Sequence, residues 1–165
     1  MRKKMIEFKK PSDFPKGTFY NQLADAYSFD ENCKEAWDIM WKEYDDFMFC
    51  NPELADKYAF VTVVDGEPVG HISWDPRYSP EYVEIGHNCI LTKYKGKGYG
   101  KLQLQEALRR IKEYEGLKKI VVTTNAFLLP AQKNYEAAGF VKVRERTNNE
   151  TPFTGNYIDY EIVLR

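Results

Sequence analysis

Residues 95–101 alternate lysine with glycine around one tyrosine, in the order KGKGYGK. Glycine lets the backbone turn tightly and exposes its N–H groups, because no Cβ atom stands in the way. An apolar stretch precedes this segment and an amphipathic one follows it, which predicts a strand, a turn and a helix. A helix that begins here adds unpaired N–H donors and the positive end of its dipole. The segment therefore predicts a binding site for phosphate.

Two common phosphate-binding motifs do not fit this segment. A P-loop would require glycine at Lys95 and serine or threonine at Leu102. A dinucleotide fingerprint that starts at Gly96 would require its third glycine at Lys101, and no βαβ unit with a ribose-binding acid follows. Both motifs are excluded.

A third motif, Arg/Gln-x-x-Gly-x-Gly/Ala between a strand and a helix, fits residues 95–100, with Lys95 at the first place. Residues 131–140, AQKNYEAAGF, match a second pattern, Ala-x-x-x-Tyr-Glu-x-x-Gly-Phe. With both blocks in this order, the chain resembles the GNAT superfamily of acyl-CoA-dependent N-acetyltransferases from about Val83 to Phe140. It departs from the family at Lys95 and at Leu128, where the family often has asparagine.

The resemblance implies a set of residues that bind acetyl-CoA. In the family the glycine turn holds the pyrophosphate through backbone N–H groups, and the strand before it pairs with the pantetheine arm. The turn residues are then Lys95, Gly96, Lys97, Gly98, Tyr99, Gly100 and Lys101, and the strand residues are Cys89, Ile90 and Leu91. Asn125 and Lys133 are weaker candidates for contacts with pantetheine or phosphate.

Transfer of an acyl group from a thioester to an amine requires a base for the amine and an acid for the leaving thiolate. The resemblance places a catalytic glutamate at Glu84, which alternation puts on the strand face of Gly86 and Asn88. Burial near aromatic residues would raise its pKa toward neutrality. A solvent-facing structural role for Glu84, His87 as the base on the opposite face, and deprotonation by solvent stay open.

The family motif also places a tyrosine, Tyr135, where it can donate a proton to the thiolate of CoA. A phenol with a pKa of about 10 stays protonated at neutral pH. The alternative is that Tyr135 is a core residue of a short helix. Cys89 as a covalent nucleophile is disfavoured, because the family transfers the acyl group directly and no base partner is visible.

The acceptor site is expected near Trp37, Trp41 and Trp74, the acidic residues between Asp25 and Asp46, and the loop Thr147–Asn156. Acids with aromatic rings favour a cationic amine through charge pairing and cation–π contact. The sequence does not choose among a polyamine, an aminoglycoside, a lysine side chain and a protein N-terminus.

The composition fits one domain over residues 1–165, a GNAT-like acetyltransferase domain. A net charge of −1 gives no field that would attract nucleic acid or a membrane. The three cysteines have no CxxC spacing and there are two histidines, so no metal site is expected. With no apolar signal segment, we expect a cytoplasmic protein with reduced cysteines, and a homodimer stays open.

Periodicity predicts helices at Thr18–Tyr27, from Ser28 to Asn51, after the glycine turn up to Gly116, and at Pro130–Ala138. The spacing of Ser28 and Glu31 is that of a capping box. The second helix should bury Cys33, Trp37, Met40, Trp41, Tyr44, Phe47 and Met48. Strands are expected at Ile6–Phe8, Ala59–Val64, Val69–Trp74, Tyr82–Leu91, Lys119–Thr124, Phe140–Arg146 and Ile158–Leu164.

The expected fold class is α/β (α+β), of the GNAT type: a mixed, mostly antiparallel, twisted sheet with helices on both faces. The expected function is that of an acyltransferase, which moves an acetyl group from acetyl-CoA to a primary amine in a ternary complex, without a metal. The alternative is a catalytically degenerate module that binds acyl-CoA as a sensor or regulator.

Overall fold

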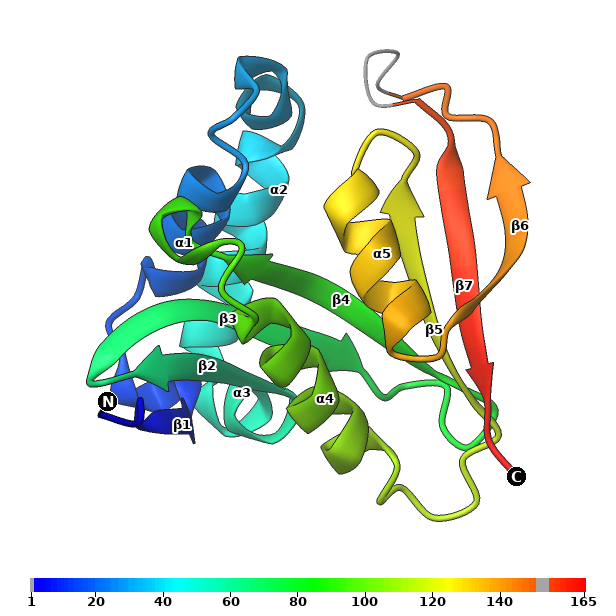
Figure 1. The fold of residues 1–165 in the computed structure, drawn as a ribbon, viewed down its shortest axis with the longest axis horizontal. Helices are drawn as coiled ribbons and strands as arrows, with labels where there is room; N and C mark the ends of the chain where they lie inside the picture. The colour runs from blue at the N-terminus through cyan, green and yellow to red at the C-terminus, as the bar shows by residue number, and fades with distance from the viewer. Residues whose placement is uncertain (1, 151–154) are drawn as a thin grey trace. The chain divides into compact units, whose positions relative to one another are not determined.

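The computed structural model describes residues 2–150 and 155–165 (Figure 1). Its seven strands follow the order β1-β2-β3-β4-β5-β7-β6. They are β1 (Ile6–Lys9), β2 (Ala59–Val64), β3 (Glu67–Asp75), β4 (Val83–Ile90), β5 (Lys119–Asn125), β6 (Val141–Arg146) and β7 (Tyr157–Val163). The helices are α1 (Thr18–Ala26), α2 (Glu31–Cys50), α3 (Pro52–Tyr58), α4 (Tyr99–Ile111) and α5 (Leu129–Ala137), with short 3-10 turns at Pro11–Asp13 and Thr92–Tyr94.

The pairing of the strands is mixed. Strands β4 and β5 run parallel, whereas β1 with β2, β2 with β3, β5 with β7 and β6 with β7 run antiparallel. The chain thus has the predicted mixed and mostly antiparallel sheet. It divides into two compact units, the first made of residues 1–73 and 87–103 and the second of residues 74–86 and 104–165.

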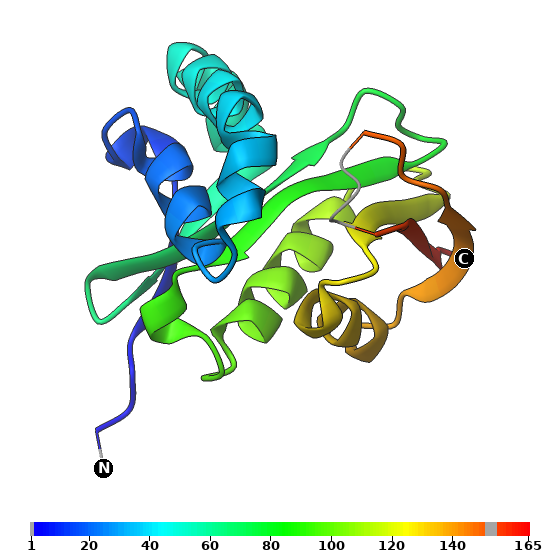
Figure 2. The same ribbon diagram turned by 90° about the horizontal axis from the view of Figure 1, so that it is seen from above.

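In the first unit, α1, α2 and α3 lie together on one face of β1, β2 and β3 (Figure 2). Phe19 of α1 is fully buried between these layers, and its ring stacks on His71 of β3 with the centroids 3.9 Å apart. Phe19 also contacts Tyr44 and Phe49 of α2 at 5.4 and 5.0 Å. Aromatic rings in such offset contacts stabilise a core beyond the area that they bury.

Helices α1 and α2 begin at carboxylates. The buried Asp45 of α2 accepts hydrogen bonds from the N–H groups of Gly17 and Tyr20, at 2.9 and 3.0 Å, and so caps the start of α1. Asp30 caps α2 by accepting from the N–H group of Asn32 at 2.9 Å. The predicted capping box at Ser28 is therefore wrong, because the Ser28 hydroxyl donates to the carbonyl of Asp25.

The predicted apolar face of α2 is only partly correct. Cys33, Trp41 and Met48 are buried, whereas Met40 and Phe47 are 45% and 53% exposed. The helical period gives an apolar stripe, but its width depends on how much of the helix other elements cover. Asn51 ends α2 as predicted, and α3, which the sequence analysis did not predict, starts at Pro52.

The turn between β2 and β3 forms at Asp65 and Gly66 as predicted. Both residues have left-handed backbone angles, with φ of 49° and 83°. Two successive left-handed residues match the twist of a two-residue hairpin, which explains the Asp-Gly pair. This turn fixes the register in which Val64 pairs with Glu67.

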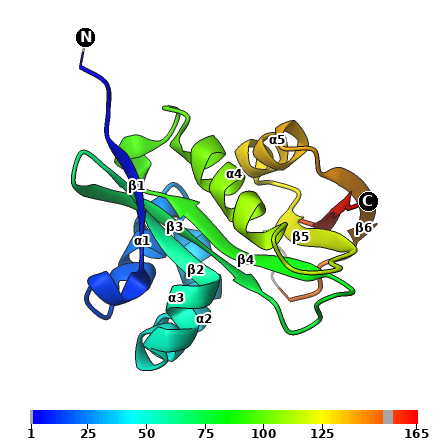
Figure 3. The ribbon, with the colours of Figure 1, turned by 90° about the horizontal axis from the view of Figure 1, so that it is seen from below.

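In the second unit, the start of β4 runs beside β5 with Val83 opposite Ile120 and Ile85 opposite Val122 (Figure 3). Helix α5 covers the face of the strands that carries Tyr160, since Tyr135 of α5 lies 6.2 Å from that ring. Side chains alternate along a strand. The odd-numbered residues of β5 and β7, which include Thr123 and Asp159, therefore belong to the opposite face.

Candidate functional site

The glycine turn of the first unit has the backbone geometry that the sequence predicts. Gly96 and Gly98 have φ of 75° and 86°, in the left-handed region. A Cβ atom at either position would meet no heavy atom within 4 Å, so backbone conformation rather than space requires glycine. Within the described residues, the N–H groups of residues 96–98 donate no backbone hydrogen bond. Helix α4 starts directly afterwards at Tyr99 and adds its own first-turn donors.

The turn is anchored to the end of α1. Thr92 donates its backbone N–H group to the carboxylate of Asp25 at 2.7 Å and its hydroxyl to the Asp25 carbonyl at 2.8 Å. The ammonium of Lys95 donates to the carbonyl of Ala26, and burial lowers the pKa of Lys95. Lys95 therefore directs its side chain to the C-terminus of α1, and its backbone remains for a ligand of the turn.

Gln103, one turn into α4, connects this helix to three strands and was not predicted from the sequence as a site residue. Its side chain is fully buried. The Nε2 group donates to the carbonyls of His71 and Cys89 and to Oδ1 of Asn88, at 2.9, 3.1 and 2.8 Å, and Oε1 accepts from Thr62 at 2.8 Å. The available signal was a polar residue on the apolar stripe that Leu104, Ala107, Leu108 and Ile111 form.

The end of β4 approaches β3 very closely. A Cβ atom on Gly70 would lie 2.1 Å from the carbonyl oxygen of Cys89, so only glycine fits there. The N–H group of Leu91 donates to the carbonyl of Val69 at 2.8 Å. Because alternate residues of a strand direct their backbone groups to opposite sides, the groups of Ile90 point away from β3. Of the three residues predicted to pair with pantetheine, Ile90 is best placed to do so.

Glu84 lies in the second unit, at the start of β4. Its side chain lines a hollow with Asp159 and Arg146, and it is still exposed to solvent. Loss of hydration raises the pKa of Glu84; Asp75 and Asp159 raise it further, and Arg146 and Arg77 oppose the rise. The direction is the one expected for a general base.

His87 lies in the first unit and packs on Tyr44, with the ring centroids 4.0 Å apart. Burial lowers the pKa of His87 to about 4, so the imidazole is neutral at physiological pH but is a weak base. Tyr44 donates a hydrogen bond to Ser73 at 2.8 Å. Burial also raises the pKa of the Cys89 thiol to about 12, which makes this cysteine a poor nucleophile.

Tyr135 and Asn125 both lie in the second unit. Tyr135 is 6% exposed and contacts the ring of Phe140 edge-on, with the centroids 5.6 Å apart. Oδ1 of Asn125, at the end of β5, is a buried acceptor without a hydrogen-bond partner in the described part of the chain. Such an atom needs a donor, so Asn125 fits a ligand with an amide N–H group. Lys133 is exposed on α5.

The three tryptophans differ in environment. Trp41 is 1% exposed and stacks on Tyr27 with the centroids 5.7 Å apart. Trp74 is 5% exposed and donates its indole N–H group to the hydroxyl of Tyr114 at 2.9 Å. Trp37 is partly exposed and contacts both Tyr27 and Trp41. A role of these residues in acceptor binding stays a prediction, and Trp37 has the most accessible ring.

The predicted site residues thus fall into two groups. The first unit contains Trp37, Trp41 and the continuous run of candidate residues from Cys89 to Lys101. The second unit contains Trp74, Glu84, Asn125, Lys133 and Tyr135. Four residues of the predicted loop Thr147–Asn156, residues 151–154, lie outside the described part. Across residues 2–150 and 155–165, no group of histidine, cysteine and acidic side chains could hold a metal ion.

Residues 18–140 match the acetyltransferase (GNAT) family. This match covers well over half of the chain. The protein belongs to the GNAT acetyltransferase family. Membership confirms the resemblance carried by residues 95–100 and 131–140 and supports an acyltransferase that binds CoA. A comparison with curated proteins finds no match.

Solved structures of GNAT proteins share the fold along nearly the whole chain. The ribosomal-protein-S18-alanine N-acetyltransferase of Escherichia coli has a TM-score of 0.70 and 15% identity, with 98% of this chain and 94% of that chain covered. The acetyltransferase yncA of Salmonella typhimurium, solved with acetyl-CoA, gives the same values. A chain of the NatC complex bound to Gag peptide and CoA has a TM-score of 0.69 and 18% identity, with 97% and 99% covered. The GNAT-type fold is therefore confirmed.

None of the helices in the described ranges is long and apolar enough to cross a membrane.

Proposed function

We propose that this protein transfers an acetyl group from acetyl-CoA to a primary amine by direct transfer in a ternary complex. The observation that carries the proposal is the glycine turn, in which the left-handed Gly96 and Gly98 lead directly into the first turn of α4, the geometry of a backbone anion site. A pyrophosphate matches such a site in charge and in its number of acceptors. Membership of the GNAT family supports the choice of CoA.

The residues of the turn, Ile90 and Asn125 would hold the cofactor. Backbone N–H groups from Gly96 to Lys101 would bind the pyrophosphate, the backbone of Ile90 would pair with the pantetheine arm, and Oδ1 of Asn125 would accept from a pantetheine amide. Lys97 and Lys101 are exposed beside the turn and add positive charge. When bound, acetyl-CoA supplies an acetyl thioester with a thiolate leaving group.

Glu84 is the base in this proposal. As a carboxylate it takes one proton from the ammonium form of the acceptor, directly or through water, and so frees the lone pair that forms the new C–N bond. Its raised pKa brings it closer to the pKa of the amine, whereas the lowered pKa of His87 makes that imidazole a weaker base. The carboxyl side chain is also exposed, so an amine can reach it.

Tyr135 is the proposed acid. Its hydroxyl would donate a proton to the thiolate as the C–S bond breaks. The nitrogen loses its second proton after the C–N bond forms; this proton would return to Tyr135 through water, and the proton taken up at Glu84 would pass to solvent. We expect Tyr135→Phe to lower kcat by about 10²-fold with little change in the affinity for acetyl-CoA, since general acids contribute roughly 10²–10⁴-fold. Steady-state rates and calorimetry on the same samples measure the two quantities. A fully active phenylalanine variant would reduce Tyr135 to a packing residue.

The acceptor is proposed to be a primary amine that is cationic in solution. The acidic residues of α2 and its partly exposed Trp37 favour a cation near that helix. The names of two structural neighbours concern a ribosomal-protein alanine and a Gag peptide, which supports an amine of a peptide or protein as one class. A homodimer remains a further hypothesis.

A sensor or regulator that binds acyl-CoA without turnover is the second candidate. The burial of Tyr135 between Phe140 and Tyr160 favours it, because a packed tyrosine need not be an acid. One assay separates the two functions. It measures the release of CoA thiol, detected with DTNB, across a panel of amines. Cys50 is an exposed free thiol that can react with DTNB, so the assay should use the Cys50→Ser variant. Turnover with at least one amine supports the enzyme, and tight binding of acetyl-CoA without turnover on any amine contradicts it.

A further inference from the structure

The second unit carries a hollow of about 550 Å³ on the strand face opposite to α5, a size typical of small-molecule sites. We call it the arginine hollow. Its charged residues are Glu84 of β4, Lys119 of β5, Arg144 and Arg146 of β6, and Asp159 and Glu161 of β7. Val121, Val143 and Tyr82 add apolar surface. Apart from Glu84, none of these residues was predicted from the sequence to have a functional role.

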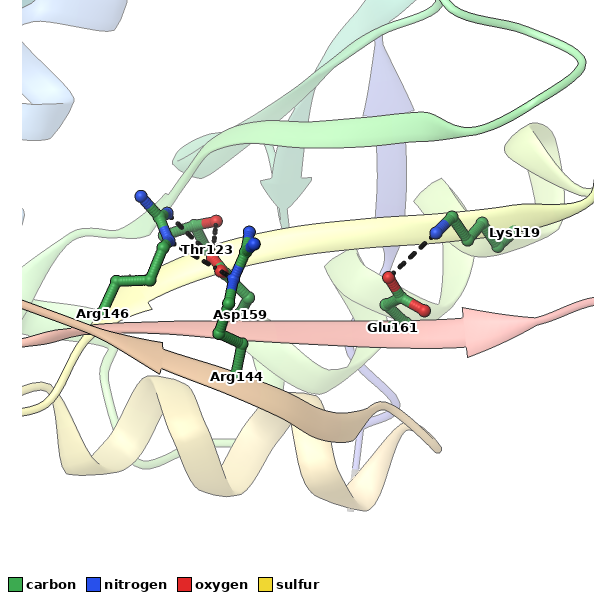
Figure 4. Close-up of polar contacts among 6 residues, drawn as sticks. All are labelled: Lys119, Thr123, Arg144, Arg146, Asp159 and Glu161. Atoms are coloured by element: carbon green, nitrogen blue, oxygen red, sulfur yellow. Dashed lines mark hydrogen bonds and ion pairs between the residues drawn. The ribbon is translucent and has the colours of Figure 1, made fainter.

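The charged side chains form two separate groups (Figure 4). Lys119 pairs with Glu161 at 3.0 Å toward one end of the strands, so these two charges cancel. At the other end Asp159 pairs with both Arg144 and Arg146, each through Nε at 2.7 Å. Two guanidinium groups share one carboxylate, so β6 and β7 together carry one positive charge in excess here, and Glu84 of β4 carries a negative charge in the same hollow.

The two arginines are held in place by Asp159 rather than neutralised. Asp159 accepts a second bond from Nη2 of Arg146 at 2.9 Å and one from the hydroxyl of Thr123 at 2.6 Å, and these donors hold its pKa far below the usual range. Arg146 also lies over the ring of Tyr157 at 5.2 Å. Both nitrogens Nη of Arg144 and Nη1 of Arg146 have no partner in the described residues, and the two side chains are 65% and 42% exposed.

Two walls of the hollow therefore carry groups of opposite charge. The β6 wall has spare guanidinium N–H groups, which recognise a carboxylate in a fixed geometry. The β4 wall has Glu84, which lines the same hollow as Arg146. A ligand with an amine and a carboxylate a few atoms apart is complementary to this pair.

We propose that the arginine hollow binds the carboxylate of a free amino acid through Arg144 and Arg146, with the amino group directed toward Glu84. The acceptor of the proposed acetyl transfer would then be an α-amino acid, and this identification rests on the proposed function. The apolar residues Val121, Val143 and Tyr82 favour an aliphatic side chain. The binding of the carboxylate itself does not depend on acetyl-CoA, so it can be measured alone.

The test is calorimetry on the full chain with the standard amino acids, leucinamide and O-phosphoethanolamine, followed by CoA-release rates with the same compounds. We expect leucine to bind at least about tenfold more tightly than leucinamide, because the amide lacks the charge that strengthens hydrogen bonds to arginine. Arg144→Gln should abolish this preference. Lys142→Gln on the same strand, which removes one charge from the exposed pair with Glu145, should keep it.

Three results would overturn the inference: equal affinity for leucine and leucinamide, no binding of any of the standard amino acids, or tighter binding of the phosphate compound. An Arg144→Gln variant with unchanged preference would do the same, and circular dichroism confirms that the variant is folded. If the preference is absent while acetyl-CoA binds and is consumed with another amine, the inference fails and the proposed function stands. If leucine binds with this preference while acetyl-CoA does not bind, the proposed function fails and the carboxylate site in the arginine hollow stands.

Discussion

Titration of Glu84 should control the rate of the proposed acetyl transfer. Burial raises its pKa above the ordinary 4.5, so the carboxyl group stays protonated to a higher pH than a free glutamate would. Only the carboxylate can accept a proton from the amine. Activity should therefore be lost as the pH falls through the raised pKa and should be fully present above it.

We expect kcat/KM to show this acidic limb in the wild type and Glu84→Gln to lose both the limb and about 10²-fold in rate. Glu81→Gln is the matched control, because Glu81 is exposed nearby and pairs only with Lys118 in the described structure. Rates measured between pH 5 and 9 check the prediction. A Glu84→Gln enzyme with the wild-type rate and profile would assign the proton transfer to solvent or His87.

Two imidazoles, that of the buried His71 and that of the partly buried His87, predict how stability depends on pH. Burial lowers the pKa of His87 to about 4 and that of His71 well below 6.5, so both are neutral in the folded state. The unfolded state takes up protons below about pH 6.5, whereas the folded state does so only at lower pH. Their contribution to stability is therefore present above pH 6.5 and is lost as the pH falls below it.

The free energy of unfolding should fall between pH 6.5 and pH 4.5 by up to about 1.4 kcal/mol per pH unit for each imidazole. His87→Gln should remove one of the two contributions and flatten the dependence. Urea unfolding at several pH values measures it. A slope that is the same in the variant and the wild type would mean that other groups cause the loss.

At the scale of elements, α4 is the helix whose position the proposed function needs. Its first turn provides N–H donors for the phosphate, and Gln103 connects that turn to β2, β3 and β4. An apolar face alone does not fix the position of a helix along a strand, because apolar contacts have no preferred direction. The buried amide allows only one arrangement, because each of its partners would otherwise lose a hydrogen bond.

We expect Gln103→Leu to lower the free energy of unfolding by about 3 kcal/mol, since it leaves several buried polar groups unpaired at about 1–3 kcal/mol each. Affinity for acetyl-CoA should also fall. Gln105→Leu, an exposed position of the same helix, should change neither quantity much. Denaturant titration and calorimetry test both effects, and two variants of equal stability would contradict the role of Gln103.

The elements themselves follow well from the sequence, and the exceptions have physical reasons. The periods of apolar residues predict the strands and the helices around the two motifs, and glycine residues predict where the helices end. Ser28 has the spacing of a capping box, yet Asp30 caps α2. Asp30 immediately precedes the first helical residue, so its carboxylate reaches the N–H group of Asn32, whereas Ser28 lies two residues farther away. Met40 and Phe47 follow the apolar period of α2 but lie beyond the part of it that is covered.

At the scale of the whole molecule, the fold and the family were predictable because two motifs occur in the right order. Each depends on residue types at fixed spacing, such as glycine at positions with left-handed backbone angles. The arginine hollow was not predictable. Asp159, Arg144 and Arg146 lie on two strands whose register includes a shift between Lys142 and Arg144, and spacing along one strand does not reveal such pairs.

The central claim is that the glycine turn binds the pyrophosphate of acetyl-CoA, and calorimetry with acetyl-CoA tests it most directly. The wild type should bind, and Gly98→Asp should not, because it places a carboxylate against the phosphates. Gly66→Asp is the matched control, since Gly66 has a similar φ of 83° and open space around its Cβ position but lies in the β2–β3 turn. Loss of binding in Gly98→Asp alone supports the account. Unchanged affinity in Gly98→Asp would contradict it.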